Sequence, residues 1–308
     1  MKKLQKYSGI DNLPSGRASE AITEGCLVLE GGAFRGVYTN GVLDALMEED
    51  INLRYTIGVS AGSLNAVNYV TGQIGRSARI NLRYRHDSRY VGRKAFSKNQ
   101  GIIGFDFIFG RMPFIPDLDK KRFRNPERKL YAVVTNLHTG QPEYIEKNSG
   151  EDFFQVIAAS SSMPFVSKPV ILNGQPYLDG GCSCKVPYEW ALNQEFENII
   201  VIRTRPRNYR KPVKSEQKFT PKQLVYRDYP KFSASLLASN ENYNHQCDEL
   251  QELEAQKRIF VIAPSQSIDI SRLEGDMEKL GALYYLGYHD AKQNLEALRT
   301  YLNRNSRL

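Results

Sequence analysis

Short apolar runs followed by glycine-rich turns and helical patterns recur in the first part of the chain. The runs at 26–30 (CLVLE) and 55–59 (YTIGV) are apolar nearly throughout, which predicts buried strands. A helical apolar stripe from Val37 to Met47 follows the first run, and a second helix is predicted at 61–72. Two strand–turn–helix units within about fifty residues indicate a parallel sheet with helices packed on its faces.

The rest of the pattern predicts further strands and helices. Strands are expected at 130–137, 142–146, 169–172, 176–179, the start of 199–206 and 259–264, and helices at 77–85, 152–163, 232–258 and 271–304. The Asn173–Gly174 dipeptide between two of these strands is typical of a β-hairpin. Because the last strand could join the main sheet, we do not expect the C-terminal part to fold independently.

Changes in composition divide the chain into three segments. Residues 1–24 form a polar leader that we expect to be loose, 25–204 carries the α/β pattern, and 205–308 is a mostly helical extension expected to pack on the same core. The boundary falls in the polar, basic stretch 205–231, which is broken by Pro206, Pro212 and Pro221.

The formal net charge is +8, and the surplus is concentrated in two stretches. Fifteen Lys and Arg stand against five Asp and Glu between Arg76 and Lys129, and ten stand against two between Arg203 and Lys231. Such charge can attract an anionic lipid surface or nucleic acid, although a solvated basic face is the simpler explanation. Because zinc-finger spacing and RNA-binding signatures are absent, we expect no nucleic-acid partner.

From the sequence we expect no targeting or membrane-spanning segment. No apolar stretch approaches the roughly 20 residues of a transmembrane helix, and the leader lacks the apolar core of a signal peptide. We therefore expect a cytoplasmic protein, with peripheral contact to the inner membrane face as a further hypothesis. Cys26, Cys182, Cys184 and Cys247 are too scattered for a disulfide framework and lack zinc spacing, so buried thiols and no metal or cofactor are expected.

The sequence 58-GVSAG-62 places Ser60 where a buried strand should turn into a helix. Such a serine can be a turn residue, a helix cap or a nucleophile. A sharp strand-to-helix turn lifts a serine Oγ out of the fold, and Gly58 and Gly62 would allow the crowded backbone. G-x-S-x-G alone is a weak signal, but the strand before it and the helix after it favour a nucleophile.

A second glycine-rich turn, 31-GGAFRG-36, also joins a strand to a helix. A dinucleotide-binding loop would need a glycine where Ala33 stands and an acidic residue at the end of the next strand, and both are missing. The alternative is an oxyanion hole in which the N–H groups of Gly32 and Ala33 face an ester oxygen as it gains charge. Arg35 could hold this loop in shape or place positive charge nearby.

The third candidate is 178-LDGG-181. Asp-Gly is a common turn dipeptide, so Asp179 alone would count as structural. A nucleophilic serine needs a base, however, and none of the four histidines lies in a motif that marks it as catalytic. Gly180 and Gly181 would let the backbone bring the Asp179 carboxylate close to Ser60.

In this order the three motifs, E-G-G-A-F-R-G, G-V-S-A-G and D-G-G, resemble those of the patatin-like phospholipase family. The segment 158–170 is similar to the family's Ala-Ser…Pro stretch, and Ala33 departs from the usual glycine. The resemblance covers about Cys26 to Pro187. It implies a three-layer α/β/α fold related to the α/β hydrolases, with 25–204 as the catalytic domain.

The resemblance further implies a Ser–Asp dyad and no metal. Ser60 would attack a lipid acyl ester, Asp179 would take its proton, and N–H groups around Gly31, Gly32 and Ala33 would hold the oxyanion. The supporting residues of the motifs would be Arg35, Gly36, Gly58, Gly62, Gly180 and Gly181.

Two other functions remain open from the sequence. A Ser-His-Asp triad could use His245 or His289, which follow Asp179 in the α/β-hydrolase order. A lipid-surface binding module could keep the scaffold without turnover. The aromatic segment 101–116 is either a lid or lipid-contact loop, or a cap on the core. The sequence defines neither the acyl ester nor the oligomeric state.

Overall fold

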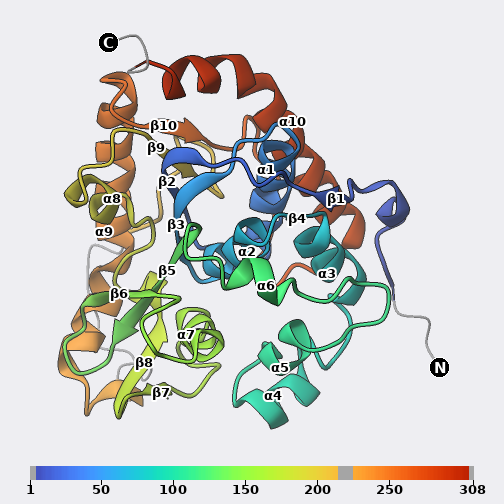
Figure 1. The fold of residues 1–308 in the computed structure, drawn as a ribbon. Coiled ribbons are helices and arrows are strands. Elements are labelled where there is room, and N and C mark those ends of the chain that lie inside the picture. The colour runs from blue at the N-terminus through green and yellow to red at the C-terminus, as the bar shows by residue number, and fades with distance from the viewer. Residues whose placement is uncertain (1–4, 214–224, 305–308) are drawn as a thin grey trace.

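The computed structural model describes residues 5–213 and 225–304, and its centre is an eight-stranded sheet (Figure 1). The strand order is β10-β9-β2-β3-β5-β8-β7, with β6 paired to β5. The strands are β2 (Thr23–Leu29), β3 (Leu53–Val59), β5 (Lys129–Asn136), β6 (Pro142–Glu146), β7 (Val170–Leu172), β8 (Gln175–Asp179), β9 (Ile199–Ile202) and β10 (Phe260–Ile262). From β10 to β5 all pairs are parallel, whereas β6, β7 and β8 pair antiparallel.

Helices cover both faces of this sheet, which gives three layers. They are α1 (Val37–Glu48), α2 (Ala61–Val70), α3 (Arg76–Tyr84), α4 (Arg93–Asn99), α5 (Phe105–Phe109), α6 (Lys120–Phe123), α7 (Phe153–Ser160), α8 (Tyr188–Asn193), α9 (Pro230–Ala255) and α10 (Met277–Leu302). In Figure 1, α8 and α9 lie on one side of the sheet and α1, α2 and α10 on the other. The α/β fold with a mainly parallel central sheet is therefore confirmed.

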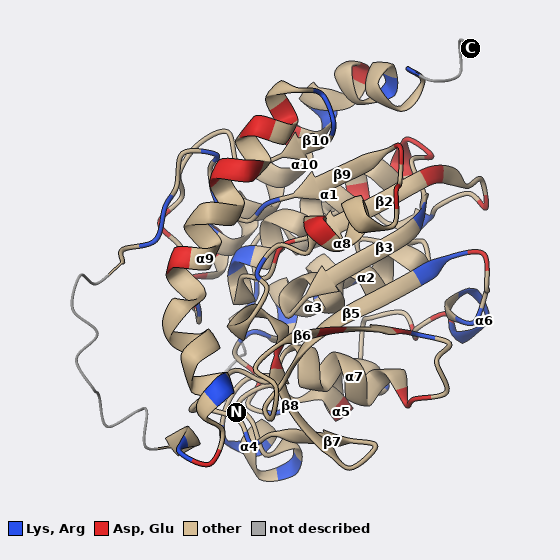
Figure 2. Cartoon of the chain, turned by 90° about the vertical axis from the view of Figure 1, so that its left-hand side faces the viewer, with Lys and Arg blue, Asp and Glu red and all other residues tan. Residues whose placement is uncertain are grey.

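Alternation along β2 explains why the sheet is buried on both faces. Leu27 and Leu29 belong to the core that includes α1, α2 and α10, whereas Cys26 and Val28 belong to the core beneath α8 and α9. All four are fully buried. Burying a Leu or Val side chain contributes about 1.5–3 kcal/mol each. Accordingly, the middle parts of β2, β3 and β5 are free of charged residues in Figure 2.

The C-terminal extension is joined to this architecture by a close helix crossing between α1 and α10. An added Cβ at Gly41 would lie 2.0 Å from the Tyr284 carbonyl oxygen, and one at Gly287 would lie 2.0 Å from the Tyr38 carbonyl oxygen. The two helix backbones therefore touch at both glycines. The Tyr284 hydroxyl also donates to the buried Asp44 at 2.8 Å. β10 meanwhile extends the parallel sheet beside β9.

Several local details differ from the sequence prediction. The last helix begins at Met277 instead of 271, because the Asp276 side chain accepts the N–H groups of Glu278 and Lys279 and so caps it. The leader is not loose where it is described, since Ile10 and Leu13 are buried in the main core. Two short strands, β1 (Gly16–Arg17) and β4 (Gln73–Ile74), and the short helices α4, α5, α6 and α8 were not predicted.

The predicted hairpin is present between β7 and β8. Asn173 and Gly174 have φ values of 44° and 77°, the left-handed geometry that a tight two-residue turn requires. Of the basic boundary stretch, residues 214–224 lie outside the described part of the chain.

Candidate active site

Ser60 occupies the turn between β3 and α2, with φ 55° and ψ −122°. Such a backbone conformation costs a non-glycine residue on the order of 1–3 kcal/mol. An added Cβ at Gly58 would lie 2.6 Å from the Gly62 carbonyl carbon, and one at Gly62 would lie 2.5 Å from the Leu29 carbonyl oxygen. Both glycines are therefore required by close backbone contacts around the serine.

Two neighbouring hydroxyl groups hold this strained turn. The Ser60 N–H donates to Ser160 Oγ at 3.0 Å, and Ser63 Oγ donates to the Ser60 carbonyl at 2.6 Å. Ser160 is the last residue of α7, so the stretch 158–170 that the sequence singled out supplies a direct brace. The positive end of α2 begins at Ala61 and faces the serine.

The strand β5 brings Asp179 to the serine. β3 pairs with β5 as far as Val59 and Val133, and Asp179 of β8 pairs with the next residue, Val134. β6 occupies the opposite edge of β5 over the same residues. β8 must therefore continue the edge that β3 leaves, and the end of β3 meets the end of β8.

The side chains of Ser60 and Asp179 are in direct contact. Ser60 Oγ donates to Asp179 Oδ2 at 2.7 Å, and the Gly181 N–H donates to Asp179 Oδ1 at 2.8 Å. Each carboxylate oxygen thus has its own donor. Thr135 Oγ1 donates to the Asp179 carbonyl oxygen at 2.9 Å and fixes the strand end. Burial raises the pKa of the Asp179 carboxyl, and the hydrogen bond from Ser60 partly offsets this rise.

The glycine-rich loop faces the same pocket as Ser60. The Gly31 N–H points toward the Lys185 carbonyl at 3.5 Å, but the N–H groups of Gly32 and Ala33 donate to no acceptor in the described residues. These two donors are therefore available to a ligand. Ala33 has φ 50°, a left-handed conformation that glycine would adopt without strain.

The remaining motif residues have identifiable contacts. The Gly36 carbonyl accepts the Asn65 amide at 2.9 Å. A Cβ at Gly180 would lie 2.2 Å from the Val133 carbonyl oxygen, so the Asp-Gly-Gly turn packs directly on β5. The Arg35 side chain lines the Ser60 pocket, and its Nε is buried without a partner in the described residues. Burial, together with Arg205 and Arg272, lowers the pKa of Arg35 to about 10.

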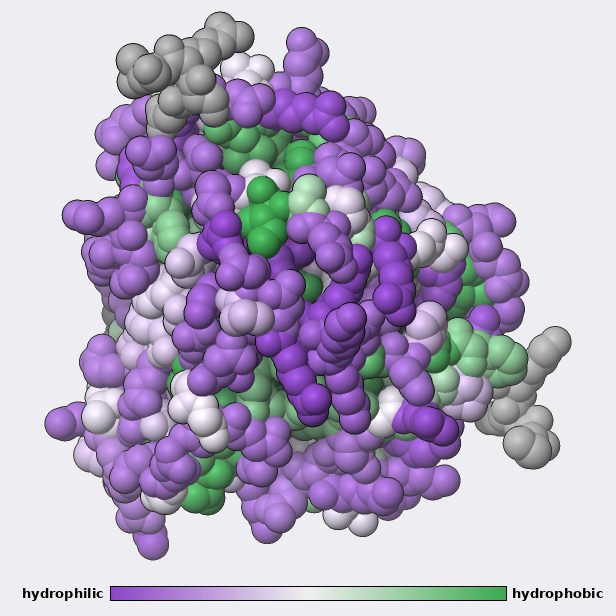
Figure 3. All heavy atoms as spheres, in the orientation of Figure 1, coloured by the Kyte–Doolittle hydropathy of each residue, from purple (hydrophilic) through white to green (hydrophobic). Residues whose placement is uncertain are grey.

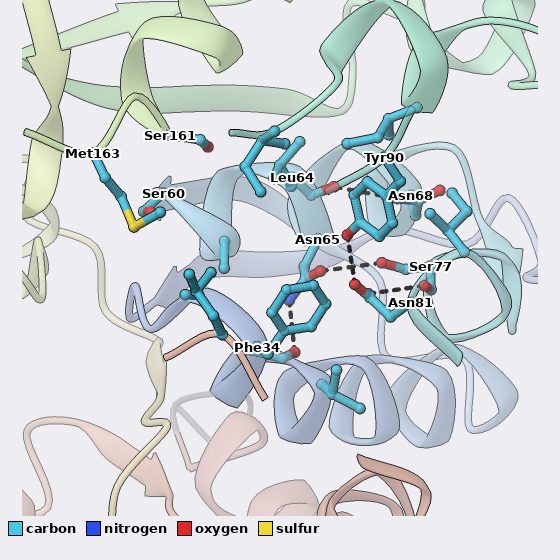
Figure 4. Close-up of a pocket in the computed structure, with 18 residues that line it drawn as sticks. Phe34, Ser60, Leu64, Asn65, Asn68, Ser77, Asn81, Tyr90, Ser161 and Met163 are labelled. Carbon is cyan, nitrogen blue, oxygen red and sulfur yellow. Dashed lines mark hydrogen bonds between the residues drawn. The ribbon is translucent and has the colours of Figure 1, made fainter. Parts of the chain in front are cut away.

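A second, mainly apolar pocket adjoins Ser60 (Figure 4). Phe34, Leu64 and Met163 line it, and its far end is closed by hydrogen-bonded Asn65, Ser77, Asn81 and Tyr90. The segment 101–116 contributes Ile103 and Ile108 to the wall. Phe105 and Ile115 are buried in the core, so this segment caps the core and lines the pocket at once.

The histidines lie elsewhere. None of the four lines the pocket that contains Ser60 and Asp179, and His245 and His289 are exposed on α9 and α10. The four cysteines are buried and free. Within residues 5–213 and 225–304, no cluster of three or more His, Cys, Asp or Glu could hold a metal ion. None of the helices in these described residues is both long enough and apolar enough to cross a membrane.

The pocket contains charged residues that the sequence analysis did not single out. Lys185 follows the Asp-Gly-Gly motif by four residues, and Arg205 and Lys211 belong to the second basic stretch. These three could have been proposed from the sequence, because they lie close to a recognised motif or within a recognised basic stretch. Arg272 also lines the pocket, but it lies in the loop before α10, and no local pattern marks it.

Fold and site together place the chain among three-layer α/β proteins that carry a serine on a strand-to-helix turn. The model for patatin-like phospholipase matches residues 27–192, more than half of the 308 residues. The chain belongs to this family. A second model, for a domain of unknown function (DUF6363), matches residues 229–303.

Individual relatives have been detected by sequence and by structure. The uncharacterized protein YjjU of Escherichia coli (strain K12) is 31% identical over 186 residues, 58% of this chain and 52% of that protein. This chain thus matches about half the length of YjjU. The probable lipid hydrolase 463L of Invertebrate iridescent virus 6 is 24% identical over 243 residues, 70% of this chain and 82% of that protein. The crystal structure of VipD from Legionella pneumophila has a TM-score of 0.49 and 16% identity, covering 96% of this chain and 71% of that one.

Proposed function

We propose that the protein is a serine acyl hydrolase that cleaves lipid acyl esters, with Ser60 as nucleophile and Asp179 as general base. The observation that carries this proposal is the 2.7 Å hydrogen bond from Ser60 Oγ to Asp179 Oδ2 on a strand-to-helix turn. Membership of the patatin-like phospholipase family and similarity to a probable lipid hydrolase support the lipid substrate.

The first half-reaction forms an acyl-enzyme. Ser60 Oγ attacks the ester carbonyl carbon while its proton moves to Asp179 Oδ2. The carbonyl oxygen gains negative charge and accepts the N–H groups of Gly32 and Ala33, each worth about 2.7–4 kcal/mol of transition-state stabilisation. Collapse of the tetrahedral intermediate breaks the ester C–O bond, and the departing alcohol takes the proton from Asp179.

The second half-reaction releases the fatty acid. A water molecule attacks the acyl carbon and gives its proton to Asp179, the Ser60–acyl bond breaks, and the proton returns to Ser60 Oγ. The raised pKa of Asp179 suits this role, because a carboxylate that binds a proton more tightly is a stronger base. Gly181 holds the other carboxylate oxygen, so the base keeps its orientation throughout.

The test is intact mass after treatment with a fluorophosphonate. We expect one adduct on the wild type, none on Ser60→Ala, and labelling slowed by about 10²–10⁴-fold in Asp179→Asn, the range for loss of a general base. Ser149→Ala, which removes an exposed serine from the turn before α7, should label like the wild type. An adduct that persists in Ser60→Ala, or undiminished labelling of Asp179→Asn, would refute the dyad. A panel of acyl esters then defines turnover.

We further propose that the protein meets its substrate at an anionic lipid surface. Phe114 is 78% exposed, and the Arg83 guanidinium lies 4.8 Å from its ring centre. The neighbouring Arg111 side chain is 93% exposed and pairs with Asp117 at 3.4 Å. The face shown in Figure 3 is mainly hydrophilic, and its hydrophobic residues form separate patches. Co-sedimentation with liposomes should increase with anionic lipid and decrease with salt. Binding that is indifferent to both would contradict this proposal.

A further inference from the structure

Two pockets of different character meet at Ser60. The apolar pocket of Figure 4 and the pocket that contains Asp179 share Ala33, Ser60, Met163 and Leu273. An ester bond placed at Ser60 therefore borders both an apolar space and a second, adjoining space. The apolar pocket suits an acyl chain, and the chemistry of the second pocket then bears on the alcohol part of the ester.

The second pocket is lined by five basic side chains from four segments: Arg35, Lys185, Arg205, Lys211 and Arg272. We call these five residues the basic cluster. Arg35 belongs to the glycine-rich loop, Lys185 follows the Asp-Gly-Gly turn, Arg205 and Lys211 follow β9, and Arg272 precedes α10. Two of the four segments thus lie within the family match at 27–192, and two lie outside it.

The carboxylates that line this pocket already accept hydrogen bonds from the protein. Its lining includes two carboxylates, Asp179 and Glu30. Asp179 accepts from Ser60 and Gly181, as described above. Glu30 accepts the Thr204 N–H at 2.5 Å and is almost fully buried.

No member of the basic cluster forms an ion pair with a carboxylate in the described residues. Lys185 Nζ donates to the Ser239 carbonyl at 2.8 Å, Arg205 stacks on Tyr209, and Lys211 Nζ lies 4.3 Å from the Tyr243 ring centre. None of these contacts brings a carboxylate to the cation.

Two neighbouring arginines that do not line this pocket, unlike the basic cluster, form ion pairs with carboxylates. Arg207 and Arg210 lie in the same segment as Arg205 and Lys211 and are paired with Glu254 and Asp248. The lack of direct ion pairs is therefore a property of the pocket and not of the basic stretch as a whole.

The cluster members repel one another. Burial lowers the pKa of Lys185 to about 8; Asp179 partly opposes this decrease, and Arg272 adds to it. Burial lowers the pKa of Lys211 to about 7; Lys185, Arg272 and Arg35 add to that decrease, and Glu30 partly opposes it. A bound anion would relieve this repulsion, and a phosphate group offers several oxygens to donors from different directions.

We infer that the basic cluster is a binding site for the phosphate of an anionic lipid headgroup, so that the substrate is an acyl ester carrying a phosphate close to the cleaved bond. This inference rests on the proposed function, because Ser60 fixes where the ester lies. It also assigns a role to the segments after β9: Arg205, Lys211 and Arg272 supply three of the five cations. A choline headgroup would need a free anion or an aromatic cage for its cation, and both carboxylates here are engaged.

The test compares three water-soluble lipids with the same eight-carbon acyl chain: 1-acylglycerol 3-phosphate, 1-acylglycerol phosphocholine and 1-acylglycerol. We expect kcat/KM to favour the phosphate monoester over the uncharged 1-acylglycerol by about tenfold or more, as charged hydrogen bonds allow. In Arg205→Gln and Arg272→Gln this preference ratio should fall about tenfold. Arg299→Gln removes the same charge from the opposite end of α10, where its partner is Glu49, and should keep the wild-type ratio. Equal kcat/KM for all three lipids would overturn the inference.

Measuring lipid binding without turnover tests this inference separately from the proposed function. Titration calorimetry with the Ser60→Ala protein and the same lipids needs no turnover. Preference for the phosphate monoester that is lost in Ser60→Ala/Arg272→Gln supports the headgroup site even if hydrolysis fails, and equal binding of all three lipids overturns it. Inorganic phosphate is the second arm: if it binds as tightly as the phosphate lipid, the site is for free phosphate and the headgroup assignment is wrong.

Discussion

Replacing Gly41 by alanine should destabilise the protein, although the same change in an open helix is stabilising. Alanine is favoured over glycine in a helix interior by about 0.8–1.0 kcal/mol. Here, however, the new Cβ would lie 2.0 Å from the Tyr284 carbonyl oxygen and 2.7 Å from the Tyr288 nitrogen. Both atoms belong to the backbone of α10, so no side chain can rotate away and the two helices must separate.

The two effects have opposite signs, and the packing effect should be larger. Overpacking a well-packed site typically costs about 1–3 kcal/mol, and a clash between two backbones belongs at the upper end. Subtracting the gain in helix propensity leaves a net loss of about 1–2 kcal/mol in the free energy of unfolding. The same change at Gly281 meets the ring of Tyr7, a partly exposed side chain that can move, and should cost less.

Urea unfolding followed by circular dichroism measures both variants. Because α10 packs directly on α1, we also propose that residues 205–308 unfold together with the rest of the chain, in one transition. A Gly41→Ala protein that is more stable than the wild type by about 1 kcal/mol would refute the reasoning. A gain of that size is what helix propensity alone gives, so the backbone clash would have no cost. Two separate transitions would refute the shared core.

Other predictions concern the site. Because Asp179 acts as a base only when ionised and its pKa is raised, kcat/KM should fall as the pH is lowered through a value above the usual 3.9 of aspartate; a profile that stays flat down to pH 4 would contradict this assignment. Ala33→Gly should stabilise the protein by about 0.5 kcal/mol, since relief of left-handed strain of about 1–2 kcal/mol exceeds the entropy cost of glycine; a lower melting temperature would show that Ala33 is not strained. His245→Ala and His289→Ala should each keep activity within about twofold, whereas a loss of two orders of magnitude would restore the triad hypothesis.

Local chemistry explains why the strands and motifs could be predicted from the sequence. The serine turn needs a strand, a helix and glycines within a few residues. Gly58 and Gly62 meet this need and can be recognised directly in the sequence. The hairpin at Asn173–Gly174 is likewise a local signal.

Long-range features were not predictable in this way. Nothing near Asp179 reports that β8 continues the edge of β5 that β3 leaves, although that pairing brings the carboxylate to Ser60. The basic cluster is assembled from four segments, and Arg272 lies 237 residues after Arg35 in the sequence (272 − 35). The Gly31 N–H, which we expected to face an oxyanion, instead points to the Lys185 carbonyl at 3.5 Å.

The crossing of α1 and α10 also sets an order of events during synthesis. Ser60 and Asp179 have both been made before β9, β10 and α10 exist, so the emerging chain carries its reactive pair while one edge of β2 and one side of α1 have no partner. Contacts between residues so far apart in the sequence form slowly, and exposed strand edges and apolar surface invite aggregation in the meantime. A chain that is released before α10 has been made would therefore be incomplete and prone to aggregate, and chaperones or proteases would have to remove it.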